Sequence, residues 1–261
     1  MTTLRKEVLH KHEAEHRAKA VKGGVDYDVL LNLCMGGDSY EVACRISFNL
    51  HPDWKELNNA VFLDFNGKEI KTMKVNGIEM ETPRIDDMWR ENKIYIETAF
   101  LKDGVTNIVE FIVDNQFNKD QFGMILSKDT DGGEYTFIQT VPYYASRILP
   151  MFDQPDLKGK FLISVIHPEN DICITTGLQT QQRKLSEVTQ KQTDLDWWDH
   201  STKCFRIDDE KSVMSCFEAT PYLSSYLLNL VCGPLACVEA TEAQTHNGIK
   251  MRIFCRSNLF I

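Results

Sequence analysis

The sequence predicts a mainly β protein: a saddle-like antiparallel β-sandwich preceded by a short N-terminal helix. Apolar and polar residues alternate with a period of two in most segments, which is typical of strands with one buried face. These short segments follow one another without intervening helical periods, which disfavours an α/β fold. The 261 residues are enough for one large β domain. We therefore assign residues 1–24 to a lead-in helix and residues 25–261 to a single β domain.

The chain opens with a weak helical stripe of apolar residues between Leu4 and Val21. We expect the Gly23-Gly24 pair to end this helix. Two alternating segments follow at residues 25–33 and 40–50, separated by a glycine-rich turn. This pattern predicts a long antiparallel hairpin with one buried face.

The remaining strands are predicted from shorter alternating runs. Between two of them, an Asn76-Gly77 dipeptide has the form of a two-residue hairpin turn. We predict a polar connection over residues 179–199, and strands at residues 61–65, 70–75, 78–80, 94–96, 107–113, 161–166, 172–174, 216–218, 226–232 and 249–255.

The composition is that of a folded, soluble chain, with 43% hydrophobic and 26% charged residues. The formal net charge of −9 disfavours nucleic acid as a partner. We expect no membrane association, because no apolar leader or membrane-length apolar window is present. The eight cysteines form no Cys-x-x-Cys pair and are expected to be buried, reduced thiols, which favours a cytoplasmic location.

Residues 137–155 form the most informative loop of the sequence. After a strand, Arg147, Pro150, Asp153 and Pro155 follow in a run that does not repeat. Taken alone, the run is also typical of a simple turn in which Asp153 bonds to local backbone. Loops with this much fixed backbone commonly carry function.

This loop resembles the signature of the aminopeptidase N family of zinc metallopeptidases, in which Thr-Gln-x-Glu/Gln is followed by a short helix and Phe-Asp-x-Pro. Gln139, residues 148–150 and residues 152–155 match that pattern. Further landmarks occur in the family's order at residues 17–29, 63–67, 75–77 and 220–233. The resemblance covers about residues 16–259 and implies a saddle-shaped β-sandwich. In the family this domain precedes a thermolysin-like catalytic domain, and we expect the chain to stop where that second domain begins.

The segment from His12 to His16 spells His-Glu-x-x-His, a zinc-peptidase motif in which two histidines bind the metal and the Glu is the general base. The resemblance implies that the third zinc ligand is a Glu nineteen positions after the second histidine, His16, and this chain has Met35 there. We therefore interpret His12, Glu13 and His16 as an exposed helix face with a coincidental spelling. Adventitious surface zinc is the alternative, and no cofactor is expected.

A second segment, residues 77–81, echoes the family's Gly-x-Met-Glu-Asn exopeptidase strand. It contains an extra residue, lacks the Asn and follows a hairpin turn in the first third of the chain. We interpret it as the edge of a strand.

The family's active members carry Glu or Gln two places after the signature Gln, where that side chain accepts hydrogen bonds from the substrate's amino group. Here Gln139 is followed at that place by Val141. A valine has no acceptor for a buried ammonium group, whose desolvation would then be uncompensated. We interpret Gln139 and Val141 as a vestigial substrate-anchor position and predict no catalytic residues.

These observations predict a non-catalytic, stand-alone relative of the aminopeptidase N-terminal domain that serves as a structural or protein-binding module. The expected partner is another protein or a large assembly, with a homo-oligomer as an alternative. A second hypothesis is a fragment or separate subunit of a zinc aminopeptidase whose catalytic domain lies elsewhere. A third is a scaffold part of a cytoplasmic, cytoskeletal or ciliary assembly.

Overall fold

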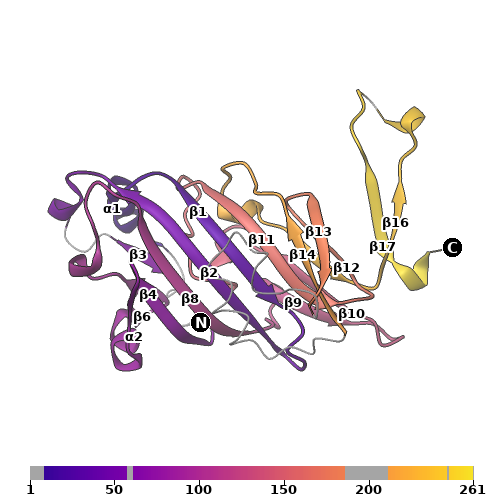
Figure 1. Cartoon of the computed structure of the whole chain (residues 1–261), viewed down its shortest axis with the longest axis horizontal. Helices are drawn as coiled ribbons and strands as arrows, with labels where there is room; N and C mark the ends of the chain where they lie inside the picture. Colours follow the sequence, from indigo (N-terminus) through magenta and orange to yellow (C-terminus); the bar gives the residue numbers. More distant parts are fainter. Residues whose placement is uncertain (1–8, 58–60, 186–210, 246, 261) are drawn as a thin grey trace.

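The computed structural model describes residues 9–57, 61–185, 211–245 and 247–260, and this part of the chain is mainly β (Figure 1). Its largest unit is an eight-stranded sheet with the order β13-β14-β11-β1-β2-β8-β4-β5. In that order, the strands span Gln179–Lys184, Ser212–Phe217, Gly159–Pro168, Val21–Asn32, Ser39–Leu50, Asn107–Gln116, Glu69–Val75 and Ile78–Glu79.

Smaller sheets cover one face of this large sheet within the described residues. One has the order β12-β15-β10-β9, with bounds Ile172–Thr175, Leu230–Gly233, Glu134–Gln139 and Gly123–Lys128. Another has the order β3-β7-β6, with bounds Phe62–Asp64, Lys93–Tyr95 and Trp89–Arg90. The predicted fold class, a mainly β sandwich with a short N-terminal helix, is confirmed.

Two α-helices lie in the described segments, α1 (Lys11–Ala20) and α2 (Thr82–Met88). Neither has the length and apolar character needed to cross a membrane. Both lie at the end of the molecule that carries β3, β4 and β6 (Figure 1). Short 3₁₀ turns occur at Trp54–Leu57, Thr98–Phe100, Ala145–Arg147, Ser225–Leu227, Glu242–Gln244 and Ser257–Leu259.

The main core fills the space between the large sheet and the smaller ones. Tyr27 of β1 stacks on Phe161 of β11, with ring centroids 4.6 Å apart. Phe48 of β2 meets the ring of Phe152 edge-on at 5.2 Å. Alternate residues of β1 and β2 therefore face this core, and the predicted hairpin is confirmed. The opposite face of the sheet has a smaller buried cluster made of Leu30, Ala43, Ile112, Ile166 and Met214.

The sequence predicted that the glycine pair after α1 ends the helix, and this prediction is wrong. The helix stops at Ala20, and β1 begins at Val21, which pairs with Leu50 of β2. Gly23 has a φ of 77° inside a register shift of β1, a conformation that favours glycine. Gly24 lies under the ring of Tyr222, where a Cβ would stand 2.2 Å from a ring carbon. The two glycines thus form a β-bulge, and the expected start of the helix at Leu4 lies outside the described residues.

One strand pair departs from the antiparallel arrangement expected from the sequence. β1 pairs with β11 in parallel, from Val25 opposite Gly159 to Asn32 opposite Ile166. The signature loop and its neighbouring segments cross the molecule between β10 and β11, and this long connection allows the two strands to run in the same direction. The parallel pair joins the N-terminal hairpin to the second half of the chain.

The polar connection predicted over residues 179–199 is wrong in its first part. Residues 179–184 form β13, which pairs with β14 at one end of the large sheet. Most of its side chains are exposed, so an edge strand such as this one lacks apolar alternation. Residues 186–199 lie outside the described residues. The elements α2, β6, β9 and β16 were not predicted from the sequence. The strand predicted at residues 226–232 begins only at Leu230.

Helix α1 is held to the body by a buried arginine. The Arg17 side chain is fully buried, and its Nη1 lies 2.6 Å from Oδ2 of Asp64 in β3. Its Nε donates to Oε1 of Gln154 at 2.9 Å, and its guanidinium lies 4.6 Å from the ring centroid of Phe62. Gln154 in turn donates to the carbonyl of Ala14, one turn earlier in the helix. These contacts make α1 part of the folded body.

We predict that Arg17→Ala lowers the free energy of unfolding by about 3–5 kcal/mol, because it leaves the Asp64 carboxylate buried without its cation. The measurement is equilibrium urea denaturation. Lys11→Ala is the matched control in the same helix, since it removes only the exposed Lys11–Glu15 pair. The control is expected to change stability by about 0.5 kcal/mol or less, and an equal loss in both variants would contradict the assigned role of Arg17.

Asp171, in the turn between β11 and β12, is partly buried close to Glu134. Burial raises the pKa of its carboxyl group to about 6, and the charge of Glu134 adds to this effect. Between about pH 4 and pH 6, the native state therefore binds more protons than the unfolded chain, and stability falls as the pH rises through this range.

We predict that Asp171→Asn raises the free energy of unfolding at pH 7.5 by about 1 kcal/mol, a figure reduced for solvent screening of this partly exposed group. At pH 4.5 the gain should largely vanish, because Asp171 is then protonated in the native protein. Thermal unfolding at the two pH values measures the difference. The exposed Asp156→Asn should show no such pH-dependent gain, and a gain for Asp171→Asn that is the same at both pH values would contradict the prediction.

Candidate functional site

The signature loop leaves β10 at Gln139 and runs to Pro155, and its Met151 forms an isolated β-bridge with Asp64 of β3. Thr140 fixes its start, because its buried hydroxyl donates to the carbonyl of Tyr226 at 2.9 Å. The carbonyl of Leu228 lies 3.3 Å from the same hydroxyl. The loop is thereby held against residues 224–228, which also belong to the family landmarks.

The second half of the loop is buried and bonded within the protein. Asp153 accepts hydrogen bonds from the Ser146 backbone N–H at 2.9 Å and from the Ser225 hydroxyl at 2.6 Å. The backbone N–H of Asp153 donates to Asp64, and that of Phe152 donates to the Tyr27 hydroxyl. Because all these groups are engaged by the fold, this half of the loop positions the chain and presents no reactive group.

The first half of the loop lies at the surface. The Gln139 side chain is exposed, and Val141 is 48% exposed. Leu227, which lies between the two carbonyls bound by Thr140, is 52% exposed. This surface offers apolar area and one amide, and no carboxylate occurs at position 141.

Tyr143 and Tyr144 follow Val141 in the loop and form an aromatic group with Phe122, in which the Tyr144 ring is buried. Phe122 stacks on Tyr144 with centroids 4.2 Å apart, and Tyr143 lies 4.8 Å from Tyr144. The Arg147 guanidinium lies over the Tyr144 ring at 4.7 Å and its Nη1 is 2.6 Å from Asp120. Partial burial raises the pKa of Asp120, but hydrogen bonding and charge from Arg147 outweigh it, so the pKa is lowered overall. Arg147 thus orders the aromatic group.

The comparisons with known proteins agree with this arrangement. The model of the peptidase M1 N-terminal domain matches residues 25–227. The chain belongs to this family. It is 23% identical over 253 residues to aminopeptidase N of Streptomyces lividans, covering 96% of this chain and 25% of that protein. It is 27% identical over 168 residues to aminopeptidase N of Haemonchus contortus, covering 57% and 15%. Human aminopeptidase Q is 24% identical over 182 residues, covering 67% and 16%. This peptidase M1 N-terminal domain chain therefore spans a quarter or less of these relatives.

The His-Glu-x-x-His spelling of this M1-type domain lies on α1. His12 and His16 are exposed, with ring centroids 6.5 Å apart. Glu13 accepts the backbone N–H of His10 at the helix start and pairs with Lys93 of β7. Partial burial raises the pKa of Glu13, but Lys93 and the His10 N–H outweigh this effect, so its pKa is lowered overall. Within the described ranges, no three His, Cys, Asp or Glu side chains are placed to hold a metal ion.

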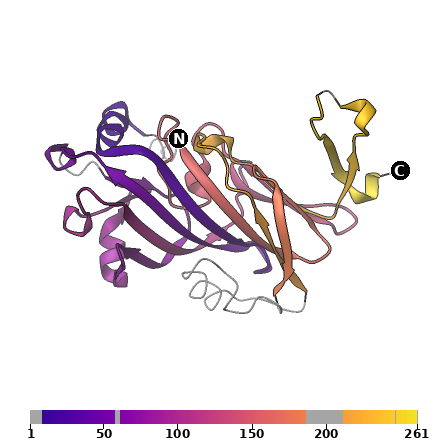
Figure 2. The same cartoon turned by 45° about the horizontal axis from the view of Figure 1, so that its top comes forward.

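Another surface was not foreseen from the sequence. The hairpin β16 (Leu235–Glu239) and β17 (Arg252–Arg256) stands away from the sheets of the body, as Figure 1 and Figure 2 both show. It is tied to the β9–β10 turn because Arg256 pairs with Asp129 and Asn258 donates to Asp131 at 2.7 Å.

One face of this hairpin is apolar, and we call it the hairpin face. It consists of Ala236, Val238, Met251, Ile253 and Cys255, which share a side of the two strands through the pairs Ala236↔Cys255 and Val238↔Ile253. Val238, Met251 and Ile253 are 48%, 51% and 70% exposed. The charged residues Glu239, Arg252 and Arg256 lie on the other face. The alternation from Met251 to Cys255 was a signal for this face in the sequence.

The division of the signature loop gives a direct test. Asp153→Ala should lower the free energy of unfolding by about 2–4 kcal/mol, because it leaves buried donors of Ser146 and Ser225 without an acceptor. Gln139→Ala, in the same loop but exposed, should change it by about 0.5 kcal/mol or less. Chemical denaturation of both variants makes the comparison. A larger loss for Gln139→Ala than for Asp153→Ala would refute the assignment of the second half to folding.

Proposed function

We propose that this chain is a non-catalytic aminopeptidase N-terminal-like module that acts by binding another protein. The observation that carries the proposal is the hairpin face, whose central residue Ile253 is 70% exposed. An isolated two-stranded hairpin has little stability of its own in water. Covering three large exposed apolar side chains with a partner chain is favourable, at about 25 cal/mol per Å² of apolar surface removed from water.

The signature loop supports the non-catalytic part of the proposal. Its buried half is engaged in folding contacts, and its exposed half carries Val141 where an acceptor for a substrate ammonium would be needed. Val141 and Leu227 instead present apolar surface. This composition suits contact with a protein surface better than recognition of a charged amino terminus.

A second candidate function is that of a zinc aminopeptidase subunit whose catalytic domain is carried by other residues. One observation favours it: the similarity to the Streptomyces protein covers 96% of this chain, whereas the domain match ends at residue 227. The hairpin therefore lies beyond the matched domain. Under this candidate, the hairpin face contacts a polypeptide that carries the zinc site.

For the location, we propose the cytoplasm, with a cytoskeletal or ciliary assembly as the larger setting of the partner. The seven described cysteines have free thiols, in keeping with a reducing compartment.

The binding surface is tested with Ile253→Asp. The partner is first isolated with the wild-type chain and purified. We expect Ile253→Asp to bind this partner about tenfold more weakly than the wild-type chain does, because the substitution puts a charge at the centre of an apolar interface. Val105→Asp is the matched control, since Val105 is 51% exposed in a loop away from the hairpin. Affinity purification with mass spectrometry identifies the partner, and calorimetry on the purified pair measures the dissociation constant.

The outcomes separate the candidates. An unrelated protein whose binding depends on Ile253 supports the binding module, and a second copy of this chain identifies a homo-oligomer. A partner that carries the zinc motif supports the aminopeptidase subunit. If Ile253→Asp and Val105→Asp bind the partner equally well, the hairpin face is not the docking surface. Chelator-sensitive hydrolysis of an amino-acid arylamide by the purified chain alone would overturn the non-catalytic assignment.

A further inference from the structure

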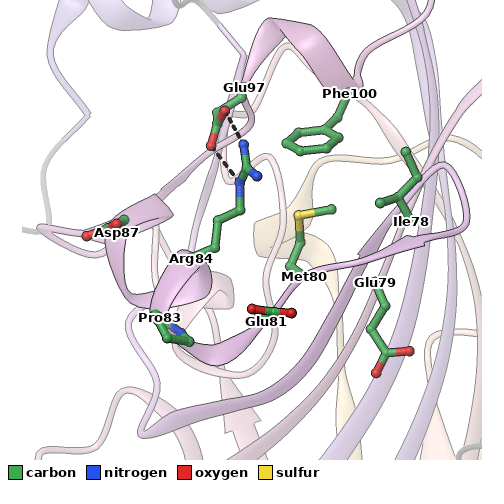
Figure 3. Close-up of a pocket in the computed structure, with 9 residues that line it drawn as sticks. All are labelled: Ile78, Glu79, Met80, Glu81, Pro83, Arg84, Asp87, Glu97 and Phe100. Atoms are coloured by element: carbon green, nitrogen blue, oxygen red, sulfur yellow. Dashed lines mark hydrogen bonds and ion pairs between the residues drawn. The ribbon is translucent and has the colours of Figure 1, made fainter.

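A groove of about 670 Å³ lies at the far end of the molecule from the hairpin β16–β17. It is formed where β5, α2 and the 3₁₀ turn Thr98–Phe100 meet. Figure 3 shows the side chains that line it. Its volume is within the range of sites that hold small molecules or several side chains of a peptide.

One side of the groove is apolar. Figure 3 shows Phe100, Met80 and Ile78 grouped there. Met80 is buried and fixes the floor, whereas Ile78 is 51% exposed and Phe100 is half-buried. These three residues offer a surface to an apolar side chain.

An ion pair lies on the other side of the groove (Figure 3). Arg84 is engaged by Glu97, with Nη2–Oε2 and Nε–Oε1 distances of 2.7 and 3.1 Å. The same guanidinium lies 4.6 Å from the ring centroid of Phe100. Hydrogen bonding from Arg84 lowers the pKa of Glu97, so this pair is internally neutral.

The carboxylates that remain give the groove its charge. Glu79, Glu81 and Asp87 are exposed along its rim. One of these carboxylates, Glu79, has a cation nearby, because Nζ of Lys74 lies 3.9 Å from it. The lining of the groove therefore carries a net negative charge beside an apolar floor.

We propose that this groove binds a basic segment of a protein in extended conformation. An apolar side chain of that segment rests on Ile78, Met80 and Phe100, and Lys or Arg side chains two positions away, which share its face, reach Glu79, Glu81 and Asp87. The negative rim repels nucleic acid and acidic peptides. A small polyamine would match the charge but would leave the apolar floor uncovered. Exposed ion pairs contribute little individually, so a specific ligand needs both the charges and the apolar residue.

The groove is separate from the hairpin face, so either surface can fail its test without the other. The probe is a fluorescein-labelled peptide, Gly-Ser-Lys-Ser-Leu-Ser-Arg-Ser-Gly, in which the Lys, Leu and Arg side chains share one face of an extended strand. The comparison peptide replaces Leu with Ser. Fluorescence anisotropy with the full chain at about 0.15 M salt measures the dissociation constants.

Two triple variants and one single variant locate the binding. Glu79→Gln/Glu81→Gln/Asp87→Asn should weaken the probe about tenfold, since it removes the carboxylates that pair with the basic side chains of the probe. Glu56→Gln/Asp156→Asn/Glu218→Gln removes the same charge from exposed positions elsewhere and should change binding less than about twofold. Ile78→Thr keeps the β-branched shape in the strand and should weaken only the apolar probe, about threefold.

Several results would overturn the proposal. Equal weakening by the two triple variants would show non-specific attraction to an acidic protein. Equal affinity for the Ser peptide, or displacement of the probe by spermine at the same concentration as unlabelled probe, would show that the apolar floor takes no part. Absence of probe binding up to about 1 mM would exclude a groove of useful affinity.

Discussion

The buried guanidinium of Arg17 joins three distant parts of the chain, and the rest of the fold depends on this junction. A charge of this kind is costly to remove from water unless it is paired and hydrogen-bonded. Asp64 supplies the opposite charge, Gln154 an amide oxygen and Phe62 an aromatic face. The same Asp64 oxygen accepts the N–H of Asp153. Helix α1, strand β3 and the signature loop therefore supply one another's hydrogen-bond and charge partners. Displacing any one of them leaves buried polar groups in the other two without their partners.

This junction explains what the family signature records. Its second half is engaged in buried contacts among Asp153, Ser146 and Ser225, which hold the loop in the fold of this chain. Its first half has no such duty, because Gln139 and Val141 point to the surface. A recognisable signature in this domain is therefore strong information about fold, and the chemistry has to be argued separately from the residue at position 141. The same separation applies to Glu13, which caps a helix and pairs with Lys93.

Sequence reasoning succeeded where one face of a strand is buried, as in β1 and β2, because burial imposes the alternation directly. It failed for β13, whose exposed edge position imposes no such pattern. The parallel register of β1 with β11 was beyond reach because it follows from long-range packing. Arg17 opens one of the family landmarks, but no pattern in the sequence predicted its burial, which depends on side chains contributed by residues 64 and 154. The groove is likewise assembled from separate segments, and no single stretch of sequence shows it.

The parallel pairing of β1 with β11 has a consequence for how the chain acquires its fold during synthesis. Strands β1, β2, β4 and β8 are made early and can pair as an antiparallel sheet in the order β1-β2-β8-β4, which leaves one edge of β1 open. That edge is a long row of unpaired backbone groups until Gly159–Pro168 leaves the ribosome. Pairing across so large a separation in sequence is slow. The nascent chain therefore passes through a stage in which its central strand is accessible to chaperones and to other unfinished chains.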